Sequence, residues 1–158
     1  MTNIYVVGVG MTPFGKFRDK TVKEMTSESV NAALKDAGLT AEAIEGAFFS
    51  NATQGHMEGQ HMIRGEIALR EMGIQGIPVV NVENACASAS TGFKLAVDFL
   101  KAGNGDVCLA VGSEKMFSDD RKLMFSAFDS GWDVSDNKGV AEQLMALGAG
   151  IEEPEGSK

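Results

Sequence analysis

The 158-residue sequence predicts an α/β fold in which a mostly parallel sheet carries helices on both faces. Short apolar segments alternate along the chain with longer segments whose apolar residues recur at helical spacing. Several of the helical segments end at a glycine, which tolerates the left-handed backbone that stops a helix. Strands that alternate with helices form βαβ crossovers, and such crossovers place the strands in one parallel sheet.

The first elements are a strand, a capped helix and a second strand. Residues 4–7 are β-branched and aromatic and precede a Gly-Val-Gly turn, so we expect a buried strand there. Thr21 and Glu24 have the spacing of a capping box, in which each side chain accepts a hydrogen bond from the other residue's backbone N–H. The helix that follows is expected to end at Gly38. Residues 47–50 should form the second strand.

Two further helix and strand pairs complete the predicted sheet. Residues 61–72 are expected to form a helix and residues 77–82 the third strand. Residues 86–102 have one apolar face and predict the third helix. Residues 106–112 are almost continuously apolar, as strands covered on both faces are, and predict the fourth strand.

The pattern changes after Glu114. Residues 117–136 mix acidic, small and aromatic side chains without a sustained period, and Asn137 then predicts the start of a last helix. We therefore expect an α/β domain over residues 1–116 and the beginning of a separate loop region over residues 117–158. The acidic end has no closing element, so we expect that this region is truncated.

The charge and cysteine content exclude several classes of protein. The chain has 14 Lys and Arg against 22 Asp and Glu, a net charge of −8 and a pI near 4.7, which argues against binding to nucleic acid or to anionic lipid. It has no apolar run that could span a bilayer and no signal-peptide pattern, so a cytoplasmic protein is expected. Its two cysteines lack the spacing of a zinc site or a disulfide framework, and no metal is expected.

The most informative segment leads from the third predicted strand through a tight turn into a helix that begins with Cys86. The partial positive charge of a helix N-terminus favours thiolate over thiol, which makes the sulfur a better nucleophile. Free N–H groups in the first turn can also hold an oxyanion. A small buried thiol in a close-packed turn would give the same sequence pattern, so the residues alone leave both interpretations open.

Other candidate residues carry less chemistry. Cys108 lies in an apolar strand and is expected to pack as a small hydrophobic residue. His56 and His61 are five residues apart, too far for a pair of metal ligands on one helix face. The Gly8 and Gly10 pair resembles a dinucleotide-binding turn, but the third glycine is misplaced and Pro13 stands where the helix should begin.

The region after residue 116 offers acidic and aromatic candidates. The acidic residues have no calcium-loop spacing and are expected to be solvated: Asp119, Asp120, Asp129, Asp133 and Asp136. The aromatic residues could line an acyl pocket or simply pack on the sheet: Phe117, Phe125, Phe128 and Trp132.

The segment around Cys86, with the pattern Asn-x-x-Asn-Ala-Cys-Ala-Ser, resembles the nucleophile elbow of the thiolase superfamily. Residues 6–15 are similar to the opening of sterol-carrier-protein-type and archaeal-type thiolases. Residues 110–116 resemble the family's Gly-Gly-x-Glu-x-Met turn, and residues 54–60 match a stretch rich in Gly and Gln. The resemblance spans residues 3–150 and implies the N-terminal half of a thiolase.

This resemblance implies covalent acyl transfer, in which a C–C bond is made or broken next to a coenzyme A thioester. Cys86 matches the acyl-carrying cysteine, and its backbone N–H would form part of an oxyanion hole. Met116, which ends the third matching segment, and Phe117 are the expected substrate contacts. Coenzyme A would be a substrate, and no tightly bound cofactor is expected.

The sequence departs from the family pattern in one serious respect. It has no Gly-His-Pro and no second catalytic cysteine, which thiolases carry in a second half. The family implies that a missing half or a partner chain supplies them, and that subunits associate into dimers or tetramers near residues 79–82. One alternative is a non-catalytic subunit that works with a zinc-bearing OB-fold protein. Another is a ketosynthase-like condensing enzyme, although the opening segment is more similar to thiolases.

Overall fold

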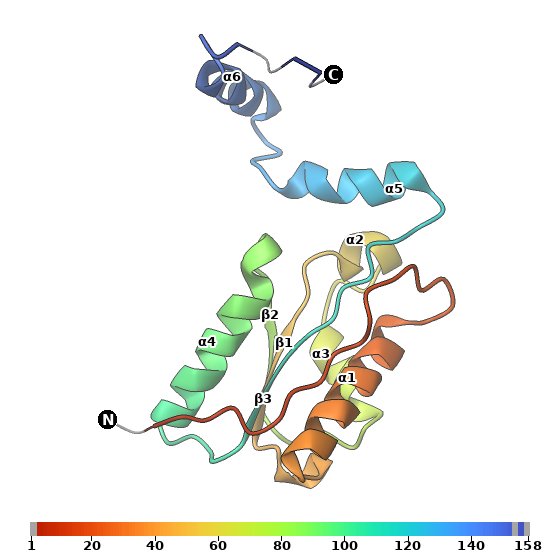
Figure 1. Cartoon of the computed structure of the whole chain (residues 1–158), viewed down its shortest axis with the longest axis vertical. Coiled ribbons are helices and arrows are strands. Elements are labelled where there is room, and N and C mark those ends of the chain that lie inside the picture. The colour runs from red at the N-terminus through yellow and green to blue at the C-terminus, as the bar shows by residue number, and fades with distance from the viewer. Residues whose placement is uncertain (1–2, 153–154, 157–158) are drawn as a thin grey trace.

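The computed structural model describes residues 3–152 and 155–156 and confirms the α/β fold. Its sheet contains three parallel strands, β1 (Gly46–Ser50), β2 (Val79–Val82) and β3 (Cys108–Gly112), in the order β2-β1-β3 (Figure 1). Phe48 of β1 lies opposite Val80 on one side and Ala110 on the other. Because the strands are parallel, their carboxyl ends all lie at the same end of the sheet. The candidate site lies at this end.

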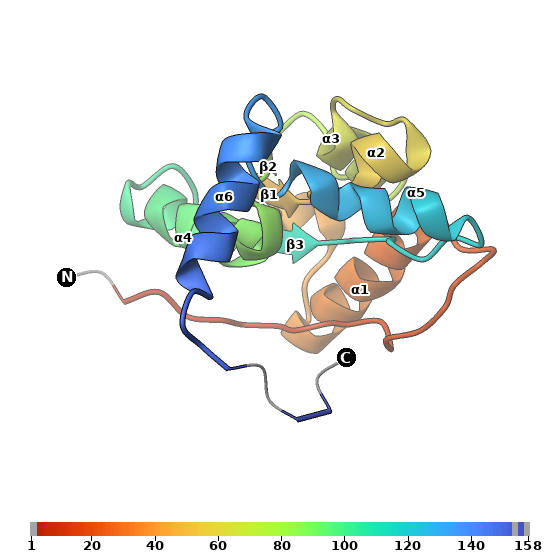
Figure 2. The ribbon, with the colours of Figure 1, turned by 90° about the horizontal axis from the view of Figure 1, so that it is seen from above.

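Helices cover both faces of the sheet, as predicted. α1 (Val22–Ala37) and α3 (Arg64–Arg70) pack on one face and α4 (Ser88–Lys101) on the other (Figures 1 and 2). The predicted capping box of α1 is present, with Thr21 accepting a hydrogen bond from the N–H of Glu24, and the helix ends at Gly38 in the left-handed region. α3 begins later than expected because the preceding short helix, α2 (Gln54–Glu58), is followed by an irregular turn.

The core fills the space between the sheet and the helices. Phe49 is fully buried and packs against Val22, Met25 and Ala68. Gly65 lets α3 approach the strand, since a Cβ there would lie 2.5 Å from the Cβ of Phe49. The second cluster on this face consists of Val30, Ile44, Ala47, Leu69 and Ile74, and the cluster under α4 consists of Phe48, Val82 and Ala96.

The prediction of a buried strand at residues 4–7 is wrong. This segment is extended but pairs with no strand among the described residues, and Tyr5, Val6 and Val7 are 73%, 65% and 62% exposed. The glycines that follow it lie against α1, where a Cβ on Gly10 would come within 2.1 Å of a backbone oxygen. The segment is therefore held beside the helix without a neighbouring strand to pair with.

The region after the sheet is more helical than expected. It contains α5 (Arg121–Ser126), a 3₁₀ turn (Ala127–Ser130) and α6 (Asn137–Leu147). α5 has only six residues, too few to show a period, and Asp120 caps it by accepting hydrogen bonds from two backbone N–H groups. α6 confirms the last predicted helix, although Asp136 caps it rather than Asn137. None of the helices that the structure describes is both long and apolar enough to span a membrane.

Candidate active site

The three segments that follow the strands meet at the carboxyl end of the sheet. The turn after β2 carries Cys86, the residue after β1 is Asn51, and β3 leads through Ser113 to Glu114. Open α/β sheets bind ligands at this end, because strand ends and helix N-termini converge there. The sequence order scatters these residues, and the parallel register brings them together.

Cys86 is the central residue of a 3₁₀ turn (Ala85–Ala87) that leads directly into α4. The prediction placed it as the first residue of the α-helix, which in the structure begins two residues later. Ser88 fixes the turn, because its hydroxyl accepts a hydrogen bond from the N–H of Asn84 (2.8 Å) and donates one to the carbonyl of Ala85 (2.7 Å). The turn therefore presents Cys86 as an exposed thiol rather than a buried one.

The backbone at the turn is strained next to the thiol. Ala85 has a φ of 45°, a left-handed conformation that costs a non-glycine residue about 1–3 kcal/mol. The N–H of Ala85 is held by Glu83 (2.6 Å) and that of Ala87 by the carbonyl of Asn84 (2.9 Å). Within residues 3–152 no hydrogen bond is found from the N–H of Cys86. This N–H lies near the positive end of α4 and can donate a hydrogen bond to an anionic oxygen.

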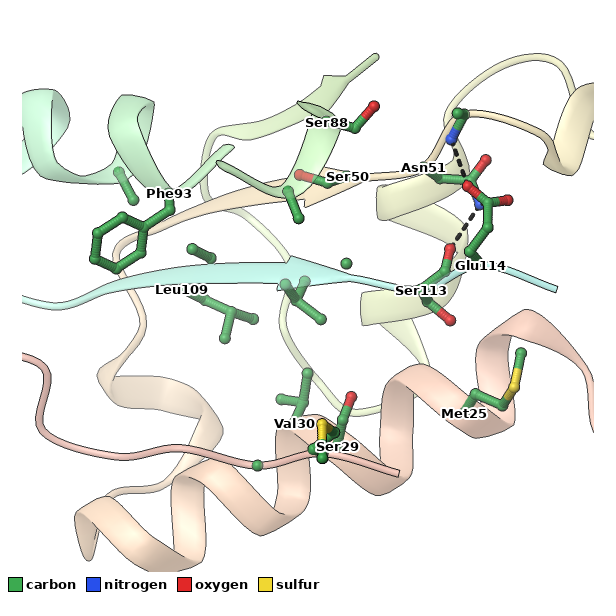
Figure 3. Close-up of a pocket in the computed structure, with 18 of the residues that line it drawn as sticks. Met25, Ser29, Val30, Ser50, Asn51, Ser88, Phe93, Leu109, Ser113 and Glu114 are labelled. Atoms are coloured by element: carbon green, nitrogen blue, oxygen red, sulfur yellow. Dashed lines mark hydrogen bonds between the residues drawn. The ribbon is translucent and has the colours of Figure 1, made fainter. Parts of the chain in front are cut away.

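Cys86 is one of the residues that line a cavity of about 1540 Å³. Figure 3 shows other lining residues, among them Ser50, Ser88 and Phe93. The walls of this cavity come from residues 3–15, from β3 and from α4. Met116, one of the two predicted substrate contacts, lines this cavity together with Cys86. Phe117 instead lines a smaller cavity of about 330 Å³, and its ring lies 5.5 Å from the ammonium nitrogen of Lys16. Of the other aromatic candidates, Phe128 is part of the larger wall.

Glu114 organises another part of the lining of this cavity. Its carboxylate accepts hydrogen bonds from the N–H groups of Ala52 (2.8 Å) and Thr53 (3.1 Å) and from the side-chain amide of Asn51 (3.1 Å). The same amide donates to the carbonyl of Ser113 (2.6 Å; Figure 3). Glu114 was not among the predicted site residues, although it lies in segment 110–116, whose resemblance to the thiolase turn was a signal.

The remaining candidates lie elsewhere or make other contacts. Cys108 is half-buried on β3, and burial raises the pKa of its thiol to about 11, so it is a poor nucleophile at neutral pH. The Nε2 atom of His56 lies 3.2 Å from the carbonyl of Leu123 and 3.0 Å from the hydroxyl of Ser126. The part of the chain that the structure describes holds no cluster of three or more His, Cys, Asp or Glu side chains suited to a metal ion.

Comparison with known proteins identifies the kind of domain that carries this site. The family described as thiolase, N-terminal domain, matches residues 4–147. The chain is 40% identical over 116 residues to the non-specific lipid-transfer protein-like 2 of Caenorhabditis elegans, covering 72% of this chain and 27% of that protein. It is 32% identical over 136 residues to the acetyl-CoA acetyltransferase of Methanocaldococcus jannaschii, covering 85% of this chain and 34% of that enzyme.

Solved structures show the same fold. The Acat5 thiolase of Ascaris suum, solved in complex with coenzyme A, matches with a TM-score of 0.64 and 20% identity, covering 71% of this chain and 30% of that one. The 3-oxoacyl-[acyl-carrier-protein] synthase III of Aquifex aeolicus matches with a TM-score of 0.55 and 17% identity, covering 63% and 31%. These structures share the fold. The present chain spans about a third or less of these proteins and of the two curated relatives.

Proposed function

This chain belongs to the thiolase family through its N-terminal domain, and on that premise we propose that Cys86 carries the acyl group of a thiolase-type reaction on coenzyme A thioesters. The observation that carries the proposal is the position of the thiol. Cys86 is exposed at the cavity mouth, on the turn that enters α4, beside a backbone N–H with no partner within residues 3–152. An accessible thiol and a free N–H donor are two of the features that a cysteine nucleophile needs.

The chemistry starts with attack of the Cys86 thiolate on the carbonyl carbon of an acyl-CoA. A C–S bond forms, and the carbonyl electron pair moves to oxygen, where the N–H of Cys86 stabilises the negative charge. Collapse of this intermediate breaks the C–S bond to coenzyme A, which leaves as a thiolate and takes up a proton. The α-carbon of a second acyl-CoA, after losing a proton to a base, then attacks the acyl-cysteine, and Cys86 is released as thiolate.

The described residues supply no base for these reaction steps. His56 is engaged by Leu123 and Ser126, and no other histidine or carboxylate has a hydrogen bond to the sulfur of Cys86 within residues 3–152. In the proposal, a further polypeptide brings the histidine and the second cysteine, either in the same chain or in a partner. That polypeptide would complete the thiolase, which agrees with the small share of the relatives that this chain spans.

The lateral edge of the sheet formed by β2 suits association between subunits. β2 is the outer strand on that side, and Val80 is 41% exposed on it. An edge strand with an exposed apolar side chain can pair with its copy across a twofold axis. A homodimer or tetramer built on β2 is therefore part of the proposed assembly.

The test of the function is the acyl-enzyme itself. The chain should be joined to the C-terminal portion of the M. jannaschii acetyl-CoA acetyltransferase, beyond the part that it matches, and incubated with radiolabelled acetyl-CoA. We expect one acetyl group on the peptide that contains Cys86, none in the Cys86→Ala variant, and full labelling in the Cys108→Ala variant.

A second candidate function is a non-catalytic subunit that binds coenzyme A thioesters with a partner. It is favoured by the absence of a base among the described residues around Cys86. An assembly that binds acetyl-CoA but leaves Cys86 unacetylated over many hours would support this candidate and refute acyl transfer. The likeness to the synthase III structure concerns the fold and does not favour a condensing enzyme over a thiolase.

A further inference from the structure

The turn that carries Cys86 contains one of the strained backbone positions of the fold. Within residues 3–152, two residues other than glycine have a positive φ, Ile63 and Ala85, and Ala85 directly precedes the thiol. A residue with a Cβ keeps such a conformation only where its surroundings hold it. The contacts that hold Ala85 therefore bear on the position of Cys86.

The carboxylate of Glu83 binds the strained peptide directly. It accepts a hydrogen bond from the N–H of Ala85 (2.6 Å), which belongs to the peptide bond between Asn84 and Ala85. The ψ of Asn84, which is 50°, and the φ of Ala85, which is 45°, set the orientation of this peptide. A hydrogen bond to a carboxylate is stronger than one to a neutral acceptor. Glu83 therefore favours this pair of angles, because other angles would turn the N–H away from its carboxylate.

The other hydrogen bonds of the turn do not replace this contact. Ser88 binds the N–H of Asn84 and the carbonyl of Ala85, which belong to the two neighbouring peptides. The carbonyl of Asn84 accepts a hydrogen bond from the backbone N–H of Ala87. Within residues 3–152, Glu83 is thus the one side chain recorded on the strained peptide itself. Glu83 is exposed, so its own burial does not require this bond.

The left-handed φ of Ala85 determines how Cys86 is presented. With a right-handed φ near −60°, the chain would turn by about 100° about the N–Cα bond of Ala85. That rotation would change the direction of the N–H and of the side chain of Cys86 relative to the end of β2. Glu83 and Cys86 both line the cavity of about 1540 Å³, so the restraint acts where the acyl group would be bound.

We propose that Glu83 is a positioning residue for Cys86. Its carboxylate holds Ala85 in the left-handed conformation, and this conformation keeps the thiol and the N–H of Cys86 in the arrangement that attack on a thioester requires. The inference rests on the proposed function, in which Cys86 carries the acyl group. A direct effect of the negative charge would act in the opposite sense, because a carboxylate near a thiol disfavours the thiolate.

Three variants separate the position of the acceptor from its charge. Glu83→Ala removes the acceptor, whereas Glu83→Gln removes the charge and keeps an acceptor oxygen of the same reach. Ala85→Gly, combined with Glu83→Ala, removes the need for the restraint, because glycine adopts a positive φ without a steric penalty. Glu83 and Ala85 are both exposed, so none of these changes removes a side chain from the core.

The experiment measures single-turnover acetylation of Cys86 in the chain joined to the C-terminal portion of the M. jannaschii enzyme, over a range of acetyl-CoA concentrations. We expect Glu83→Ala to lower the rate at saturating acetyl-CoA at least tenfold and to change the concentration for half-maximal rate less than threefold. The rate of Glu83→Gln should stay within threefold of that of the parent. The double variant should react at least fivefold faster than Glu83→Ala. Thermal melting of each variant verifies that it folds.

Four outcomes would overturn the inference. They are an unchanged rate in Glu83→Ala, an equal loss of rate in Glu83→Gln, a double variant no faster than Glu83→Ala, and a change confined to the concentration for half-maximal rate.

Failure of the proposed function gives a different result, because the parent would then remain unacetylated. In that case amide exchange at Ala85 still tests the restraint without the thiol. It should be at least tenfold faster in Glu83→Ala than in the parent, and unchanged exchange would show that the carboxylate does not hold the turn.

Discussion

Cys108 should be nearly inert to alkylation at neutral pH, although a small reagent can reach it. It is half-buried on β3, and desolvation of the thiolate raises the pKa of its thiol from 9.0 to about 11. Only the thiolate attacks iodoacetamide, and each pKa unit changes its population tenfold. At pH 7 the reactive fraction of Cys108 should therefore be about a hundredfold smaller than that of an ordinary thiol.

The assay is a timed pulse of iodoacetamide followed by peptide mass spectrometry on the assembled protein. The rate at Cys108 should rise about tenfold for each pH unit between pH 7 and pH 10, as expected for a group that titrates above that range. Cys86 should react faster at every pH, and single-cysteine variants separate the two rates. Equal rates at pH 7, or a plateau of the Cys108 rate near pH 9, would refute the placement of this thiol in the sheet and the assignment of Cys86.

Three further predictions concern the fold around the site. Gly92→Ala should lower the free energy of unfolding, measured in urea, by about 1–3 kcal/mol, although alanine has the better helix propensity. The reason is that the new Cβ would lie 2.3 Å from the hydroxyl oxygen of the buried Ser50. Adding Ser50→Ala should restore most of the loss. Glu114→Gln should cost about 1–3 kcal/mol in the same assay and speed amide exchange at residues 52–53, since the carboxylate holds both N–H groups. Hydrogen bonds from backbone N–H groups lower the pKa of Glu45 from its usual value of 4.5. The stability that this carboxylate contributes is therefore present above pH 4.5 and is lost as the pH falls through the lower pKa of the folded state. The melting temperature of Glu45→Gln should accordingly fall less steeply than that of the parent between about pH 5 and pH 3.

Much of the fold could be predicted because its signals are local. The capping box of Thr21 and Glu24 and the stop at Gly38 depend on residues within a few positions of one another, and both are confirmed. The three strands of the sheet are apolar runs that carry their own pattern. α5 could not be predicted in this way, because a helix of six residues shows no period.

The candidate site divides along the same line. The pattern around Cys86 predicted a strand, a turn and a helix that begins with the cysteine. The structure has the strand, the turn and the helix, but Cys86 lies in the turn, two residues before the helix. It could not show that Ala85 takes a left-handed φ, or that Glu114 binds the turn after β1 across 61 residues of sequence. Those contacts depend on strand register, which only the assembled sheet determines.

Residues 4–7 show what can be predicted from local sequence and what depends on contacts with distant residues. Their composition is apolar and typical of a strand, and it predicts correctly that they are extended. Whether an extended segment becomes part of a sheet depends on a neighbour that offers hydrogen bonds, and only the tertiary structure revealed that this neighbour is not among the described residues. A strand is stabilised by partners distant in sequence, whereas a helix satisfies its own backbone, and for that reason helix ends follow from the sequence and strand pairing does not.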